Sequence, residues 1–100
     1  MKPRSGQSIE KIAKFVSLGH IQGPANCRVL LDELEALAKA ARAVGCAPDD
    51  LPWKATNGSS ISDIELFVSR GRSQNPANCR LLLQRIAALG EALRRREAAA

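Results

Sequence analysis

The residues of this chain best suited to nucleophilic or metal chemistry are three cysteines and one histidine. A cysteine nucleophile needs a histidine base and an orienting acid, and a zinc site needs closely spaced ligands. Cys27, Cys46 and Cys79 lie far apart in the sequence, and His20 is the single histidine. The chain also has no Gly-rich phosphate loop and no paired carboxylates. The sequence therefore predicts a protein that is not an enzyme and uses no metal or other cofactor.

One short polar segment, Pro-Ala-Asn-Cys-Arg with its neighbours, occurs twice, within residues 22–31 and residues 74–83. The match extends without a gap over Ser8–Arg42 and Ser60–Arg94, where roughly half of the aligned positions are identical. The spacing between the two copies is about 52 residues. This pattern predicts an internal duplication.

Both copies carry polar residues at a helix start that core packing does not require, and we expect them to lie near solvent. They are Gln22, Asn26 and Arg28 in the first copy, and Gln74, Asn78 and Arg80 in the second. One interpretation is that the amide side chains bond the backbone of the turn and lock it. The other is that the two turns form equivalent contact patches for a partner. The sequence leaves both open.

The chain has a formal net charge of +5, which favours acidic partners, either nucleic acid or an acidic protein surface. Arginine suits bidentate contacts to carboxylates and phosphates. Because Arg70 and Arg72 add to Arg80 in the second copy, we expect that copy to be the main contact. Trp53, the only tryptophan, is a further candidate contact as an exposed anchor, or else a lid on the core.

Apolar residues recur at the i, i+3, i+4, i+7 spacing of helices, and proline and glycine residues mark the ends. The expected helices are Ile9–Leu18, ended by Gly19; Pro24 to the residue before Gly45; one from Ile61, ended by Gly71; and Pro76 to about Arg95. The predicted fold is all-α. It consists of two tandem duplicated helical hairpins packed into one small four-helix bundle.

The two long helices each have one predicted core stripe. Its members are Cys27, Leu30, Leu31, Leu34, Leu37, Ala38 and Ala41 in the first, and Cys79, Leu82, Leu83, Ile86, Leu89, Gly90 and Leu93 in the second. The thiols are expected to be small, buried core residues. Ala38 and Gly90 are small residues at equivalent positions, which predicts a close approach of another helix there.

The predicted organisation is simple. It comprises a basic arm (1–7), the first hairpin (8–44), a linker (45–59) with a turn at residues 57–58, the second hairpin (60–96) and a tail (97–100). No segment resembles a signal peptide or reaches the length needed to span a bilayer. We therefore expect the chain in the reducing cytoplasm of a bacterial cell, with no membrane contact. As a separate expectation, it is a monomer.

The chain resembles the small anti-CRISPR proteins of the type I-F inhibitor group, which phages and mobile elements encode. The resemblance lies in its first ten residues, MKPRSGQSIE, and in the twin Pro-Ala-Asn-Cys-Arg segments. It implies a non-catalytic inhibitor that binds a Cas surveillance complex in a bacterial host and blocks target-DNA binding or unwinding. Because this chain is basic, the implied mode is docking at a protein surface or subunit junction. The resemblance transfers no individual functional residue.

A helix-turn-helix DNA-binding protein, such as a phage or plasmid regulator, is the alternative. The second long helix offers residue types that read base edges, namely Asn78, Arg80, Gln84 and Arg85. The first long helix has Asp32, Glu33 and Glu35 in the matching region, and these carboxylates repel phosphates.

Overall fold

The computed structural model describes residues 8–45, 54–55 and 57–99. They form four helices, α1 (Ile9–Ser17), α2 (Pro24–Val44), α3 (Ile61–Ser69) and α4 (Pro76–Ala99). The all-α prediction is confirmed, and three helices end within a residue or two of their predicted bounds. The fourth runs on past Arg95 to Ala99, because alanine favours the helix and no glycine or proline interrupts it there.

Local capping residues set the helix ends. The Ser8 hydroxyl accepts a hydrogen bond from Lys11 N at the start of α1, and Ser60 and Asp63 form a reciprocal capping box at the start of α3. Gly45 ends α2 with φ of 69°, in the left-handed region that glycine adopts without strain. These three ends follow from sequence alone.

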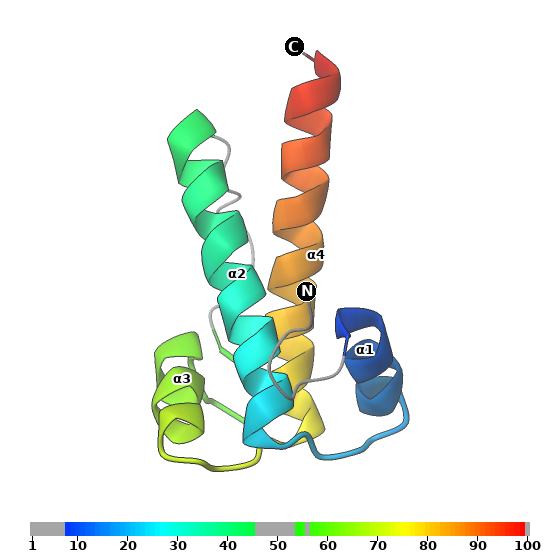
Figure 1. Ribbon diagram of the computed structural model, residues 1–100, viewed down its shortest axis with the longest axis vertical. Helices are drawn as coiled ribbons and strands as arrows, with labels where there is room; N and C mark the ends of the chain where they lie inside the picture. Colours follow the sequence, from blue (N-terminus) through cyan, green and yellow to red (C-terminus); the bar gives the residue numbers. More distant parts are fainter. Residues whose placement is uncertain (1–7, 46–53, 56, 100) are drawn as a thin grey trace.

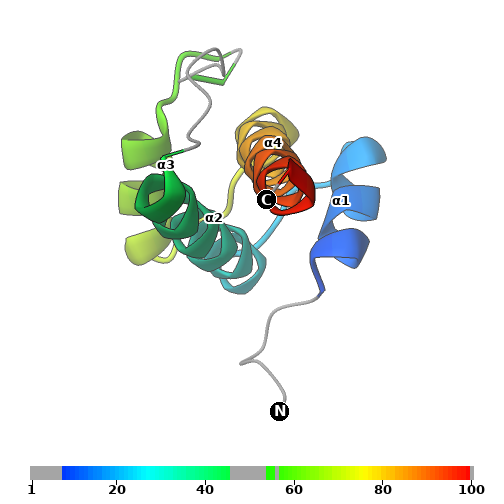
Figure 2. The same ribbon diagram turned by 90° about the horizontal axis from the view of Figure 1, so that it is seen from above.

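The two long helices form the centre of the molecule (Figures 1 and 2). They lie side by side and begin at the same end, with α1 beside α4 and α3 beside α2. Each short helix thus packs chiefly against the long helix of the other half. In two independent hairpins, α1 would pack chiefly on α2 and α3 chiefly on α4. The observed crossed arrangement lets both short helices bury their apolar stripes along the contact between α2 and α4.

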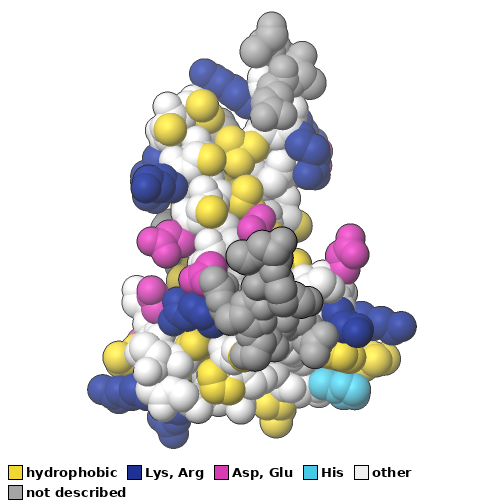
Figure 3. Space-filling model, in the orientation of Figure 1, with side chains coloured by type: hydrophobic (Ala, Val, Ile, Leu, Met, Phe, Trp, Pro, Cys, Tyr) yellow, Lys and Arg dark blue, Asp and Glu magenta, His cyan; other side chains and the backbone are white. Residues whose placement is uncertain are grey.

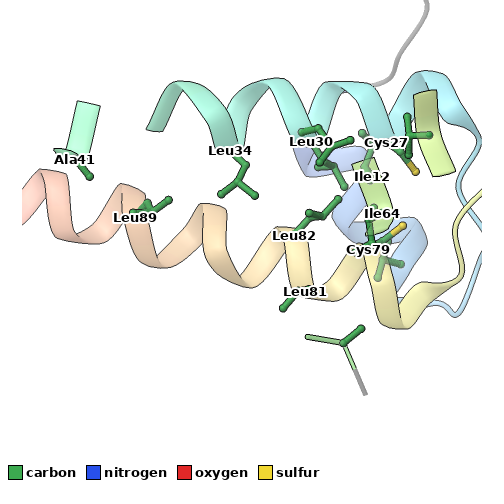
Figure 4. Close-up of a cluster of buried hydrophobic side chains, with 14 residues drawn as sticks. Ile12, Cys27, Leu30, Leu34, Ala41, Ile64, Cys79, Leu81, Leu82 and Leu89 are labelled. Atoms are coloured by element: carbon green, nitrogen blue, oxygen red, sulfur yellow. The ribbon is translucent and has the colours of Figure 1, made fainter. Parts of the chain in front are cut away.

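The core is densest where α2 and α4 begin (Figure 4). Its fully buried side chains come from all four helices and are Ile12, Leu30, Ile64, Leu82, Cys27 and Cys79. Leu34, Ala41 and Leu89 continue it along the two long helices. Burial of each leucine or isoleucine here contributes about 1.5–3 kcal/mol.

Two details of the predicted stripes are wrong. Leu81, outside the predicted stripe, is 3% exposed and belongs to the core. Gly90 does not mark a close helix approach, because the nearest described atom to a Cβ at this position is Arg94 Nη1 of the same helix, at 3.6 Å. A contact between helices depends on how they dock, which the size of one residue does not reveal.

The predicted linker is described only near its end. Its turn at residues 57–58 is confirmed, because Gly58 has φ of 92° and its N–H donates to Ala55 O at 2.9 Å. Ala55 is buried in the core. Trp53 lies outside the described residues. None of the helices in the described ranges combines the length and the apolar character needed to cross a membrane.

Candidate functional site

The two turns that precede α2 and α4 are joined to each other. Gln22 N donates to Gln74 O at 3.0 Å, and Gln74 N donates to Gln22 O at 2.9 Å. This reciprocal pair fixes the turns side by side at one end of the molecule. We call this surface, formed by residues 18–23 and 70–75, the turn end.

The amides of the repeated segment lock both turns from within. Asn26 Nδ2 donates to Gln22 Oε1 at 2.8 Å, and Gln22 Nε2 donates to His20 O at 3.4 Å. In the second turn, Asn78 Nδ2 donates to Gln74 Oε1 at 2.7 Å, and Gln74 Nε2 donates to Ser73 O at 3.0 Å. The interpretation that these amides bond the turn backbone is confirmed for the two glutamines, whereas the two asparagines bond the glutamine side chains.

The expectation that these amides lie near solvent is wrong for three of them. Gln22, Gln74 and Asn78 are only 2%, 3% and 3% exposed. The paired turns cover their own polar groups, and a buried carbonyl or amide needs a hydrogen-bond partner inside the protein. The Gln and Asn side chains that both copies share supply those partners, so these residues serve the scaffold first.

The thiols of the repeated segment lie directly behind the turns. Cys27 Sγ donates to Gln22 O at 3.7 Å, and Cys79 Sγ donates to Gln74 O at 4.0 Å. Both residues are fully buried. The neighbouring Cys27 thiol, together with burial, raises the pKa of the Cys79 thiol well above its usual range. Because its pKa is raised, the buried Cys79 thiol stays protonated and is a poor nucleophile. The prediction of two buried core cysteines is confirmed.

The outer residues make the two halves of the turn end different. The His20 ring stacks on Phe15 with 6.1 Å between ring centroids, whereas the Arg72 guanidinium lies over the Phe67 ring at 5.6 Å. Leu18 is 62% and Ile21 is 68% exposed in the first half. The second half has exposed polar and basic residues at the equivalent positions, Arg70 and Ser73.

Hence the turn end has an apolar side and a basic side. In Figure 3, Lys and Arg side chains project from the foot of the molecule on the α3 side; on the α1 side the foot carries hydrophobic and His side chains, with Lys and Arg side chains just above them. A surface with both kinds of group can combine apolar burial with contacts to carboxylates or phosphates.

The predicted arginines have three different placements. Arg70 and Arg72 are exposed at the turn end itself, and Arg80 is exposed on the second turn of α4. Arg28 is half-buried and pairs with Asp32, with 3.6 Å between Nη1 and Oδ1. The structure therefore leaves Arg70, Arg72 and Arg80 on the surface, as contact with a partner requires.

A polar pocket of about 270 Å³ opens beside the second turn. The linker turn and the start of α4 both contribute to it, with Asn57, Ser59, Phe67, Arg72, Asn75 and Asn78 among its lining residues. Asn75 also caps α4, because its Oδ1 accepts from Asn78 N at 2.9 Å. The sequence marked residues 57–58 as a turn, but nothing in it placed that turn against α4.

No group of three or more His, Cys, Asp or Glu side chains within the described ranges could hold a metal ion. Comparison of the chain with protein-family models, with curated proteins and with solved structures finds no match in any of the three. The geometry of the turn end is therefore the basis for assigning a function.

Proposed function

We propose that the chain is a non-catalytic binding protein that docks onto an acidic partner surface through the turn end. The observation that carries this proposal is the pair of exposed arginines, Arg70 and Arg72, on a surface held rigid from beneath. The reciprocal bonds between Gln22 and Gln74 fix that surface before any partner arrives, so little conformational entropy is lost on docking.

The charge of the turn end supports an acidic partner. Residues 18–23 and 70–75 include no Asp or Glu. Directly behind them, α2 and α4 begin at Pro24 and Pro76, and the positive ends of both helix dipoles point the same way. The exposed Leu18 and Ile21 add apolar area next to this charge.

A Cas surveillance complex is the specific partner that we propose, on the basis of the resemblance to type I-F anti-CRISPR inhibitors. Such an assembly offers extended surfaces and subunit junctions. A rigid body that occupies one of them blocks target-DNA binding or unwinding by steric exclusion, with no chemical step. An acidic patch at that site would complement the basic side of the turn end.

The test is affinity capture of the assembled surveillance complex with the tagged chain. Replacing Arg70, Arg72 and Arg80 together with alanine is expected to weaken capture at least about tenfold, or about 1.4 kcal/mol. A matched triple variant, K39A/R42A/R96A, removes the same charge from exposed positions far along α2 and α4, away from the turn end and the neighbouring Arg80, and is expected to bind like the wild type. Equal loss in both variants would show general charge attraction and contradict docking through the turn end.

The DNA-binding alternative is tested in the same preparation by a mobility-shift assay. Asn78, one of its expected base-reading residues, already uses its Nδ2 to donate to Gln74, so its amide cannot make the two-bond contact by which asparagine reads adenine. We expect no sequence-specific duplex binding. Specific binding that weakens steeply as salt rises, without capture of a protein complex, would overturn the proposed function in favour of DNA recognition.

A further inference from the structure

The direction of the hydrogen bonds in the second turn leaves one particular atom without a partner. Ser73 O can only accept, so Gln74 must turn its Nε2 toward it. Gln74 Oε1 then faces Asn78, and Asn78 must donate through Nδ2. The remaining atom, Asn78 Oδ1, is buried and has no hydrogen-bond partner among the described residues.

A buried acceptor without a donor is unfavourable, because folding removes its water and supplies nothing in return. Asn78 is 3% exposed and lines the pocket beside the second turn. A ligand in that pocket with an N–H or O–H group would therefore supply the hydrogen bond that Asn78 Oδ1 lacks among the described residues.

The pocket also has a definite charge preference. Arg72 is the charged residue among its lining groups, and none of the described residues that line it is acidic. The Arg72 guanidinium lies over Phe67, with 5.6 Å between Cζ and the ring centroid, and both residues line the pocket. Arginine in this position favours a carboxylate, which it can bind with two parallel hydrogen bonds.

The first turn lacks this combination although its inner residues are identical. In its chain of amide hydrogen bonds, which we call the relay, Asn26 is only half-buried. His20, Ile21 and Gly23 stand where the second turn has Arg72, Ser73 and Asn75. The differences fall on pocket residues, so they change what can bind there and leave the relay intact.

We propose that this pocket binds a carboxylate with a neighbouring amide N–H, as presented by an acidic peptide segment. The amide N–H donates to Asn78 Oδ1, and the carboxylate pairs with Arg72. This deepens the proposed function and rests on it, since the peptide segment would belong to the acidic partner surface. The same chemistry occurs at an aspartate within a chain and at a chain's C-terminal residue.

Small probes separate these two sources in a titration of the ¹⁵N-labelled protein followed by NMR. N-acetyl-aspartate N-methylamide carries a side-chain carboxylate, and N-acetylglycine carries a terminal one. The neutral control is N-acetyl-asparagine N-methylamide. We expect saturable shifts of residues 72–78 with at least one acidic probe, and the tighter of the two identifies the source. The absence of saturable shifts with both, or equal binding of the neutral probe, would overturn the proposal.

Variants test the two contacts. R72H copies the first turn and R72Q removes the charge; each is expected to weaken the acidic probe about threefold. N78A is expected to weaken it about tenfold, whereas the matched variant N26A, which cuts the equivalent relay, keeps wild-type binding. Because N78A also removes a scaffold bond, the arginine variants decide the outcome if N78A does not fold. Unchanged binding in R72H and R72Q would overturn the assignment.

The probes need no partner protein, so the two proposals can fail separately. Probe binding without capture of any surveillance complex would reject that partner and leave the pocket standing. Capture that depends on the turn end, without probe binding, would reject the pocket's role and leave the docking proposal standing.

Discussion

The first and second turns share their inner residues and differ in their outer ones. In each, a buried Gln takes an amide hydrogen bond from an Asn four positions later, and a buried Cys lies behind the turn. Outside, His20 and Gly23 stand opposite Arg72 and Asn75. The comparison teaches that burial restricts the inner positions to the same residue types in both turns. The outer positions are free to differ and can define a contact surface.

The inner residues are restricted because the turns depend on each other. Gln22 and Gln74 exchange both backbone hydrogen bonds, so a change in either turn also disturbs the other. Outer residues such as Ile21 and Ser73 are exposed, and exposed substitutions commonly change stability by less than about 0.5 kcal/mol. Variants can test this division between inner and outer positions.

The largest effect is expected at the paired thiols. Cys79→Asp places a charge in a fully buried site with no ion-pair partner, and we expect it to lower the free energy of unfolding by more than about 3 kcal/mol. Cys27→Asp is expected to cost about the same, since both halves share one core. Urea unfolding followed by circular dichroism measures both. If one variant loses less than half the unfolding free energy that the other loses, the two thiol sites are not equivalent. Cys→Ala at each site is the control for lost side-chain volume.

The next effect is expected at the buried glutamines. Gln74→Ala leaves Asn78 Nδ2 and Ser73 O without partners, and we expect a loss of about 1–3 kcal/mol in unfolding free energy. Gln22→Ala is expected to be similar. Urea unfolding midpoints give the comparison, with the exposed Gln84→Ala as the control. If both glutamine variants unfold like the wild type, the relay does not lock the turns.

A smaller effect is expected at the two helix caps, where the turns differ. Asn75 caps α4 through its side chain, whereas Gly23 caps α2 without a side-chain bond. Asn75→Ala is therefore expected to lower stability by about 1 kcal/mol. The reciprocal Gly23→Asn is expected to raise stability by a few tenths of a kcal/mol. Thermal unfolding of both variants checks the signs, and a loss of stability in Gly23→Asn would show that the first turn rejects the cap of the second.

The smallest effect is expected at the starts of the short helices, and it depends on pH. Hydrogen bonds from the Ser60 backbone and side chain lower the pKa of Asp63. A lowered folded pKa means that the carboxylate stabilises the protein above the unfolded pKa of Asp and loses this contribution as pH falls through the folded pKa. Asp63→Ala is expected to unfold earlier than the wild type at neutral pH, with the gap closing in acid.

Urea unfolding at a series of pH values measures this gap, and Glu65→Ala on the same helix is the control. The equivalent position in α1 is Lys11, so Lys11→Asp would build the missing box beside Ser8. We expect it to raise stability at neutral pH alone. A gap at Asp63 that is the same at all pH values would contradict an effect of the carboxylate charge.

Local sequence signals were sufficient for the four helices and for all their ends except that of α4, which runs on to Ala99. Pro24, Gly45 and the Ser60–Asp63 box each act within a few residues of themselves, so the chain around them predicts their structure. The apolar stripes predicted most of the core positions for the same reason, because helical spacing decides which residues share a face, but they missed Leu81. The exposed Arg70 and Arg72 were also predictable, since arginine is rarely buried without a partner.

Tertiary structure decided the features that depend on residues far apart in the chain. Only docking places Gln22 against Gln74, α1 on α4, and Asn57 in one pocket with Asn78. A glutamine looks the same in sequence whether it is solvated or buried in a paired turn. Whether it is buried depends on which segment packs against it in the folded chain. For this reason the amides that we expected at the surface are buried, where they hold the two turns of the turn end in place.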